Sequence, residues 1–173
     1  RPEEIEAIRT AASIADRAFD HVLTMIKPGV TEREVALARE MQMKKLGATK
    51  LSFESIVASG KRGALPHGIA SDKVIESGEL VTLDFGCVYE GYCSDMTRTI
   101  AVGEVSDEMR TIYHTVLEAQ EAALDAILGE KRAQTRGRKA QPVATFGCHL
   151  YAGSGSLIIA QELLLAELNA KTV

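Results

Sequence analysis

The chain has 173 residues, of which 46% are hydrophobic and 25% are charged, the balance of an ordinary soluble globular domain. No apolar run approaches the roughly 20 residues that span a bilayer, so we expect no membrane segment, and the net charge of −4 argues against a nucleic-acid partner. Three cysteines (Cys87, Cys93 and Cys148) without Cys-x-x-Cys spacing indicate free thiols and a cytoplasmic protein.

Two amphipathic helices are expected at the start of the chain. The first covers Pro2–Ile26 and ends at Lys27-Pro28-Gly29. A capping box, Thr31–Glu34, begins the second, and Gly47 ends it. The predicted buried stripes are Ile5, Ile8, Ala12, Ala15, Phe19, Leu23 and Ile26 in the first helix, and Val35, Ala38, Met41 and Leu46 in the second.

A strand and a loop with a histidine are expected next. Leu51–Ser59 has strand composition, and the glycines of Gly60–Gly63 indicate a turn. His67 then stands between Pro66 and Gly68. A histidine there is poorly placed for core packing, and a functional imidazole facing a cleft and an ordinary exposed side chain are equally consistent with the pattern.

Leu80–Ala101 is predicted to form a β-hairpin with one carboxylate, Asp84 or Asp95, in each strand. A turn at Tyr89-Glu90 pairs the two acids directly, whereas a turn at Glu90-Gly91 pairs Asp84 with Thr97 and leaves Asp95 diagonal to it. Both registers place the acids on the same face. Because neighbouring like charges repel, a metal ion or a proton is expected there; two solvated carboxylates on an exposed face are the alternative.

A third helix is expected after the hairpin, with Ser106 as its N-cap and an apolar stripe from Met109 to Ile127. The order helix, helix, strand, hairpin, helix predicts an α+β fold with helices packed on the apolar face of an antiparallel sheet. The face that carries Asp84 and Asp95 is left to line a cleft.

Four motifs resemble the Xaa-Pro dipeptidases and aminopeptidase P, metallopeptidases of the pita-bread fold related to methionine aminopeptidase and creatinase. They are IVASG (Ile56–Gly60), ALPHG (Ala64–Gly68), LDFG (Leu83–Gly86) and YCSDMTRT (Tyr92–Thr99). The resemblance covers residues 1–127 and implies the N-terminal half of a pita-bread domain. It further implies a peptidase that removes a residue before proline or splits Xaa-Pro dipeptides.

The resemblance also implies roles for three residues. Asp84 would hold one divalent ion through both oxygens, Asp95 would bridge two ions, and His67 would face the proline-containing substrate. Such ions lower the pKa of a bound water and polarise the scissile carbonyl. Oxygen ligands suit manganese best, with cobalt, iron or zinc as alternatives.

The remaining ligands of the family's site are not found in the sequence. A histidine in a Gly-His-Gly context and two glutamates should follow, but Ala144–Leu157 only faintly echoes that region, and no metal role is assigned to His149, Glu162 or Glu167. We therefore expect this chain alone to be weakly active or inactive. The alternatives are a non-catalytic peptide- or protein-binding module of the same fold and an inactive fragment.

The composition changes near Leu128. Residues 128–173 contain six Lys/Arg and three Asp/Glu, whereas the other 14 Lys/Arg and 21 Asp/Glu lie in residues 1–127. The basic stretch Glu130–Pro142 is interpreted as a solvated loop or a nucleic-acid-binding arm, and Leu157–Leu168 as an apolar helix. Residues 128–173 are thus treated as an atypical tail, a truncated, rearranged or frame-shifted C-terminal half. A lone half-domain would expose apolar surface, which predicts a homo-oligomer.

Overall fold

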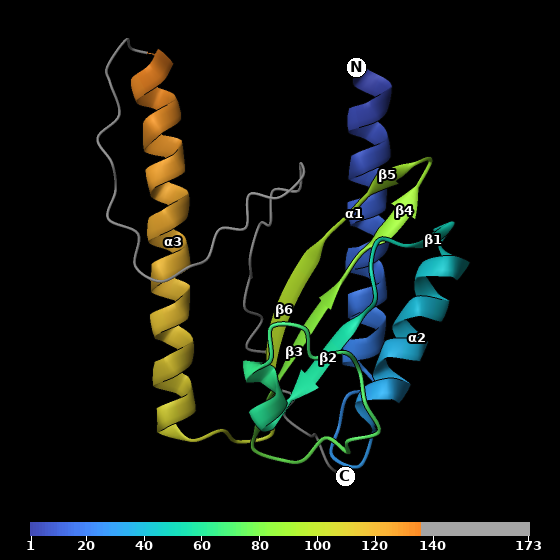
Figure 1. Ribbon diagram of the computed structural model, residues 1–173, viewed down its shortest axis with the longest axis vertical. Coiled ribbons are helices and arrows are strands. Elements are labelled where there is room, and N and C mark those ends of the chain that lie inside the picture. Colours follow the sequence, from blue (N-terminus) through green and yellow to red (C-terminus); the bar gives the residue numbers. More distant parts are fainter. Residues whose placement is uncertain (136–173) are drawn as a thin grey trace. The chain divides into compact units, whose positions relative to one another are not determined.

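The computed structural model describes the backbone of residues 1–135 and the side chains of residues 1–122. Residues 1–106 lie in one compact unit and α3 in a second, and each unit is described by itself. The predictions for the basic stretch after Thr135 and for the apolar helix lie outside the described residues. The elements are α1 (Pro2–Leu23), α2 (Glu32–Lys45), β1 (Lys50–Leu51), β2 (Ile56–Ser59), η1 (Gly60–Ala64), β3 (Glu79–Phe85), β4 (Cys87–Tyr89), β5 (Tyr92–Cys93), β6 (Met96–Val102) and α3 (Asp107–Thr135) (Figure 1).

Helix α1 packs through small side chains, and its buried face differs from the predicted stripe. Ile5 and Ile8 are 59% and 48% exposed, so their predicted burial is wrong. Alanines allow the helix to approach its neighbours closely, so the alanine-rich face of α1 is the one that packs against them. The larger isoleucines near its start therefore do not identify the buried face. The buried residues are Ala7, Ala11, Ile14, Ala15, Ala18, Phe19 and Val22.

The capping box predicted for α2 is confirmed, and its predicted stripe is confirmed in part, because Val35 is buried. The Thr31 hydroxyl accepts a hydrogen bond from the Glu34 amide at 3.2 Å, and Glu34 Oε2 accepts one from the Thr31 amide at 2.7 Å. Met41, predicted to be buried, is 58% exposed. The face that turns inward instead contains two charged residues, because buried hydrogen-bond and aromatic partners are available to them. This face consists of Glu32, Val35, Arg39 and Met43.

The sheet of β2, β3 and β6 is antiparallel, and its register confirms one of the two predicted alternatives. Asp84 pairs with Thr97, and Tyr89 pairs with Tyr92 across a Glu90-Gly91 turn. Both turn residues have positive φ, 48° and 85°, as a tight two-residue hairpin turn requires. β3–β4 and β5–β6 are therefore two arms of one hairpin.

Three predicted strands are each divided in two, and the prediction that Asp95 lies within a strand is wrong, because it falls in the break between β5 and β6. β3 and β4 are interrupted at Gly86, where a Cβ atom would overlap the carbonyl oxygen of Ser94. The stretch predicted as one strand before the loop is two strands, because β1 joins the sheet of β4 and β5 whereas β2 joins that of β3 and β6. The chain therefore changes sheets between residues 51 and 56.

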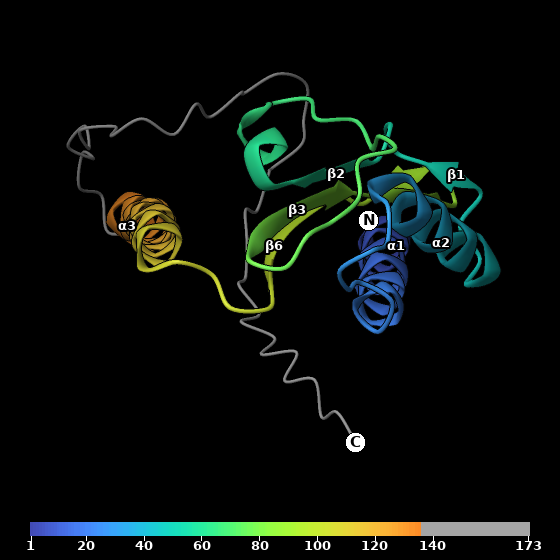
Figure 2. The same cartoon turned by 90° about the horizontal axis from the view of Figure 1, so that it is seen from below.

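The core lies between the helices and the apolar face of β3 and β6. Val81, Leu83 and Phe85 of β3 are fully buried, and the rings of Phe19 and Phe85 stack with centroids 6.0 Å apart. Figure 2 shows α1 and α2 side by side on the same side of the strands. The predicted α+β arrangement, with helices on one face of an antiparallel sheet, is confirmed.

Helix α3 begins at Asp107 as predicted, with Asp107 and Glu108 in its first turn. Ile112 and Val116 of its predicted apolar stripe are exposed, whereas Tyr113 is buried. Within residues 1–135 no helix is both long and apolar enough to cross a bilayer.

Candidate metal and substrate site

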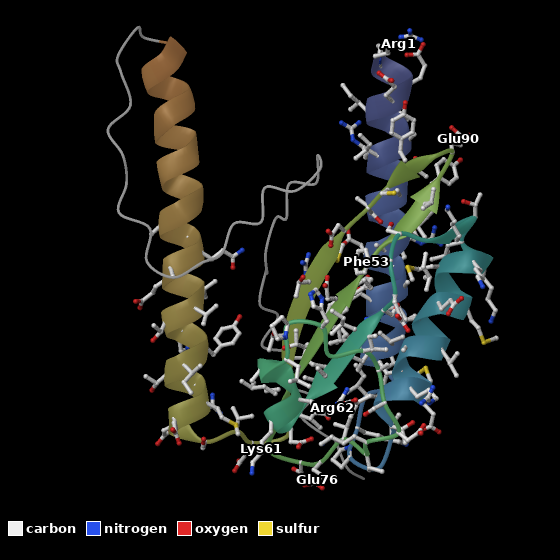
Figure 3. The ribbon with its side chains drawn as sticks, in the orientation of Figure 1. Arg1, Phe53, Lys61, Arg62, Glu76 and Glu90 are labelled. Atoms are coloured by element: carbon white, nitrogen blue, oxygen red, sulfur yellow. The ribbon has the colours of Figure 1, made fainter. Side chains whose placement is uncertain are left out.

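The three side chains selected from the sequence line one cleft in the first unit. Its volume is about 390 Å³, and His67, Asp84 and Asp95 lie in its wall. Phe53, which is labelled in Figure 3, and Glu54 precede β2 and were not selected as site residues. The cleft has an apolar part and a polar part, so it can hold a ligand that combines both characters. It is lined by Phe53, Glu54, Ile56, His67, Ile69, Asp84 and Asp95.

Asp84 occupies this cleft because strand alternation turns it away from the buried Leu83 and Phe85. Thr97, its cross-strand partner, donates a hydrogen bond from its hydroxyl to Asp84 Oδ1 at 2.9 Å. Burial raises the pKa of the Asp84 carboxyl above its usual value, although the Thr97 hydrogen bond and the charge of Arg39 oppose the shift. The backbone therefore places a charged group where water stabilises it poorly.

Asp95 precedes β6 and lies diagonal to Asp84 on the same face, as the confirmed register requires. Burial raises its pKa, and the negative charge of Asp84 raises it further. The two carboxylates thus destabilise each other, and a cation bound between them would remove this repulsion. Carboxylate oxygens are the donors that hard divalent cations prefer.

The pair fits part of a divalent metal site. Among the side chains of residues 1–122, no group of three or more His, Cys, Asp or Glu is arranged to hold a metal ion. His67 lies in the same cleft wall but is not grouped with the two acids as a third ligand. Asp84 and Asp95 therefore supply two carboxylates to such a site, and Glu54, which also lines the cleft, is not grouped with them.

His67 is presented by the loop between η1 and β3. Its side chain is exposed, and its carbonyl oxygen accepts a hydrogen bond from the Ile69 amide at 2.8 Å. Ile69 pairs with Ile56 as an isolated bridge, which attaches the loop to the edge of β2. Gly68 must be glycine for this close approach, because a Cβ atom there would lie 2.9 Å from Ala58 Cβ. The loop therefore passes directly beside the strand whose end lines the cleft.

Arg39, which the pattern did not select, lies beneath the site on α2. Its side chain is fully buried, with its guanidinium carbon 4.3 Å from the Phe85 ring centroid. Its Nη2 makes a long bond of 3.4 Å to the Ile56 carbonyl, and Nε and Nη1 have no hydrogen-bond partner among the described residues. Burial lowers its pKa to about 9, opposed by the charge of Asp84, so the group stays protonated at neutral pH. In the sequence, one feature indicated that Arg39 is buried: it shares a helical face with Glu32, Val35 and Met43.

Known proteins resemble this chain closely over its N-terminal part. The family model "Metallopeptidase family M24" matches residues 6–156, which extends past residue 127, where the resemblance seen in the sequence ends. The Xaa-Pro dipeptidase of Pyrococcus furiosus is 52% identical over 124 residues, which make up 72% of this chain and 36% of that protein.

Solved structures agree with this match. The Xaa-Pro dipeptidase from Bacillus anthracis has 61% identity and a TM-score of 0.68, covering 69% of this chain and 34% of its own. The X-Pro aminopeptidase from Thermotoga maritima has 49% identity and a TM-score of 0.70, covering 73% and 36%. The chain therefore spans about a third of the length of these relatives. These matches confirm the pita-bread fold class. The chain belongs to metallopeptidase family M24.

Proposed function

We propose that this chain contributes the first part of a metal-dependent peptidase site that acts on Xaa-Pro bonds. The observation that carries the proposal is the convergence of His67, Asp84 and Asp95 on one cleft, in a chain that is similar to Xaa-Pro dipeptidases and an X-Pro aminopeptidase. The names of these relatives indicate the substrate class, which includes both Xaa-Pro dipeptides and longer peptides with proline in the second position.

Asp84 and Asp95 are proposed as the metal ligands, and His67 as the residue that meets the substrate. Bound divalent ions would supply Lewis-acid polarisation of the scissile carbonyl and activation of water. The carboxylates hold the cations and lose their mutual repulsion in doing so. The His67 imidazole, which is exposed on its loop, would hydrogen-bond the peptide, and Phe53, Ile56 and Ile69 would provide apolar surface for the proline ring.

Manganese is the proposed metal, because both ligands from the described residues are carboxylates. Two further proposals concern the protein's state. The exposed Ile5 and Ile8 of α1 support a homo-oligomer, and the free thiols of Cys87 and Cys93 support a reducing, cytoplasmic environment.

The test uses the purified chain, Mn(II) and the dipeptide Ala-Pro. We expect weak Mn(II) binding in calorimetry, lost in Asp84→Asn and retained in the control Asp72→Asn, whose carboxylate pairs with Arg33 outside the cleft. We also expect little or no hydrolysis of Ala-Pro, since two carboxylates alone leave the donor set incomplete.

Two outcomes would change the proposal. Mn(II) binding that Asp84→Asn leaves intact would remove the assigned ligand role. Robust Mn(II)-dependent hydrolysis that Asp84→Asn abolishes would instead support the peptidase assignment and overturn the expected inactivity, because the remaining ligands would then come from the tail or another subunit.

A further inference from the structure

The Glu32 carboxylate is a fully buried junction between α2 and the loop that carries His67. Its Oε1 accepts hydrogen bonds from the Ser59 amide at 2.7 Å and the Ser59 hydroxyl at 2.9 Å. Its Oε2 accepts bonds from the Ser71 amide at 3.1 Å, the Ser71 hydroxyl at 2.6 Å and Arg62 Nε at 3.0 Å. One side chain therefore joins the residue before η1, a residue within it and a residue beyond His67.

The first turn of α2 fastens the far end of this loop a second time. The backbone amide of Glu32 donates to the Lys73 carbonyl at 3.0 Å, and that of Arg33 donates to the Ser71 carbonyl at 3.0 Å. These amides have no partner within the helix, so the loop satisfies them. Both ends of the loop, Ser59 and Ser71, are thus held by one helical turn.

Arg62 extends this junction into the loop itself. While its Nε binds Glu32, its Nη2 donates to the Ile69 carbonyl at 2.7 Å. Ile69 in turn donates from its amide to the His67 carbonyl at 2.8 Å. A continuous series of short contacts therefore runs from the buried carboxylate to the backbone of His67. Figure 3 marks Arg62 and the neighbouring Lys61 on this turn.

Apart from these bonds and the Ile69–Ile56 bridge, the loop buries few large side chains. Leu65 is 50% exposed and Ile69 is 45% exposed, so few buried side chains stabilise its conformation. A segment of this kind opens easily unless specific bonds prevent it. An arginine can make these two bonds at once because its planar group presents donors in a fixed fork, which lysine lacks.

We propose that Glu32 and Arg62 are positioning residues that fix the His67 loop against the cleft wall that contains Asp84 and Asp95. The proposal rests on the proposed function in one respect, the contact of His67 with the substrate. The loop's dependence on Arg62 can be measured without activity.

The principal variant is Arg62→Met, which keeps the aliphatic part of the side chain and removes both hydrogen bonds. Arg62→Lys is the conservative variant, because it can keep the ion pair with Glu32 but cannot also reach the Ile69 carbonyl. Arg33→Met is the matched control, since Arg33 joins the same helix turn to the same loop through its exposed pair with Asp72, at 2.6 Å.

Hydrogen exchange measured by mass spectrometry reports on the loop. We expect Arg62→Met to speed exchange in residues 60–71 about tenfold, with β3 and β6 unchanged. Arg62→Lys should show an intermediate increase and Arg33→Met none. Unchanged loop exchange in Arg62→Met, or an equal increase in β3, would overturn the proposal, the latter because Arg62 would then stabilise the whole unit.

Paramagnetic Mn(II) separates failure of this proposal from failure of the proposed function. The His67 ring signal in NMR is assigned by its loss in His67→Gln, and added Mn(II) should broaden it unless Asp84→Asn is present. Arg62→Met should weaken that broadening while Mn(II) affinity stays the same. No broadening in the unsubstituted chain would contradict the metal assignment alone, whereas undiminished broadening in Arg62→Met would overturn the positioning role.

Discussion

Two regions of the first unit bury carboxylates, and they shift the pKa values of those carboxylates in opposite directions. Glu32 is fully buried, yet its pKa lies below the usual value: burial acts to raise it, but hydrogen bonds from Ser71 and Ser59 outweigh that effect. Asp84 and Asp95 are less buried, yet their pKa values are raised by burial and, for Asp95, by the charge of its neighbour.

The difference separates a structural acid from a pair suited to bind a ligand. Five donors surround Glu32, so a cation has nothing to add there. Asp84 accepts one hydrogen bond from the Thr97 hydroxyl, and the like charge of Asp95 lies close to it. Neighbouring carboxylates that are partly buried and repel each other lower the stability of the fold, and such pairs are typical of functional sites.

Glu32→Ala should produce the largest effect, because it leaves Arg62 and the Ser59 and Ser71 amides without their buried acceptor. We expect a loss of roughly 3–5 kcal/mol in the free energy of unfolding, measured by urea denaturation. The control Glu40→Ala removes the Glu40–Lys44 pair, at 2.7 Å on the same helix, and should cost less than about 0.5 kcal/mol. Similar losses in both variants would mean that the buried bonds of Glu32 contribute no more to stability than an exposed ion pair on the same helix.

Arg39→Met should have the opposite sign. It replaces a buried guanidinium, two of whose nitrogens have no hydrogen-bond partner in the described part of the chain, by an apolar side chain that can still contact Phe85. We expect the free energy of unfolding to rise by roughly 1–3 kcal/mol. Destabilisation in a chain that still folds would indicate that the Arg39 charge compensates Asp84 more strongly than its burial costs.

The pH dependence of stability gives a smaller effect that also distinguishes the regions. Because the pKa of Glu32 is lowered on folding, its contribution is present above the unfolded value of 4.5 and is lost as pH falls through the folded value. The difference in unfolding free energy between the unsubstituted chain and Glu32→Gln should therefore be constant near neutrality and shrink below pH 4.5. A difference that persists unchanged under more acidic conditions would show that its origin is not the ionised carboxylate.

The carboxylate pair could be predicted from the sequence because strand alternation does not depend on long-range detail. Both candidate turns placed Asp84 and Asp95 on one face, so the uncertainty in register did not affect the site. The motif around His67 identified the loop, and the structure brings it into the same cleft wall.

Glu32 and Arg39 could not be predicted in this way. A charged residue on a helix is ordinarily taken as solvent-facing, and the partners that make burial of Glu32 favourable lie 27 to 39 residues further along the chain. The exposure of Ile5 and Ile8 has a similar origin, since the alanine-rich face of α1 is chosen by what packs against it. Contacts between segments distant in the sequence therefore determine which of these residues are buried, and local periodicity alone does not reveal them.

Asp95→Asn should give the smallest change and the most direct test of the comparison. In the presence of a chelator, removing one of two repelling charges should raise the free energy of unfolding by roughly 0.2–1 kcal/mol. With Mn(II) present, the order should reverse, because a cation that binds only the folded chain stabilises the unsubstituted protein and not the variant. Thermal unfolding with and without Mn(II) measures both effects. If Asp95→Asn lowered stability in chelator, the two carboxylates would not destabilise each other. The Asp84–Asp95 pair would then resemble Glu32, a buried acid that its neighbours stabilise.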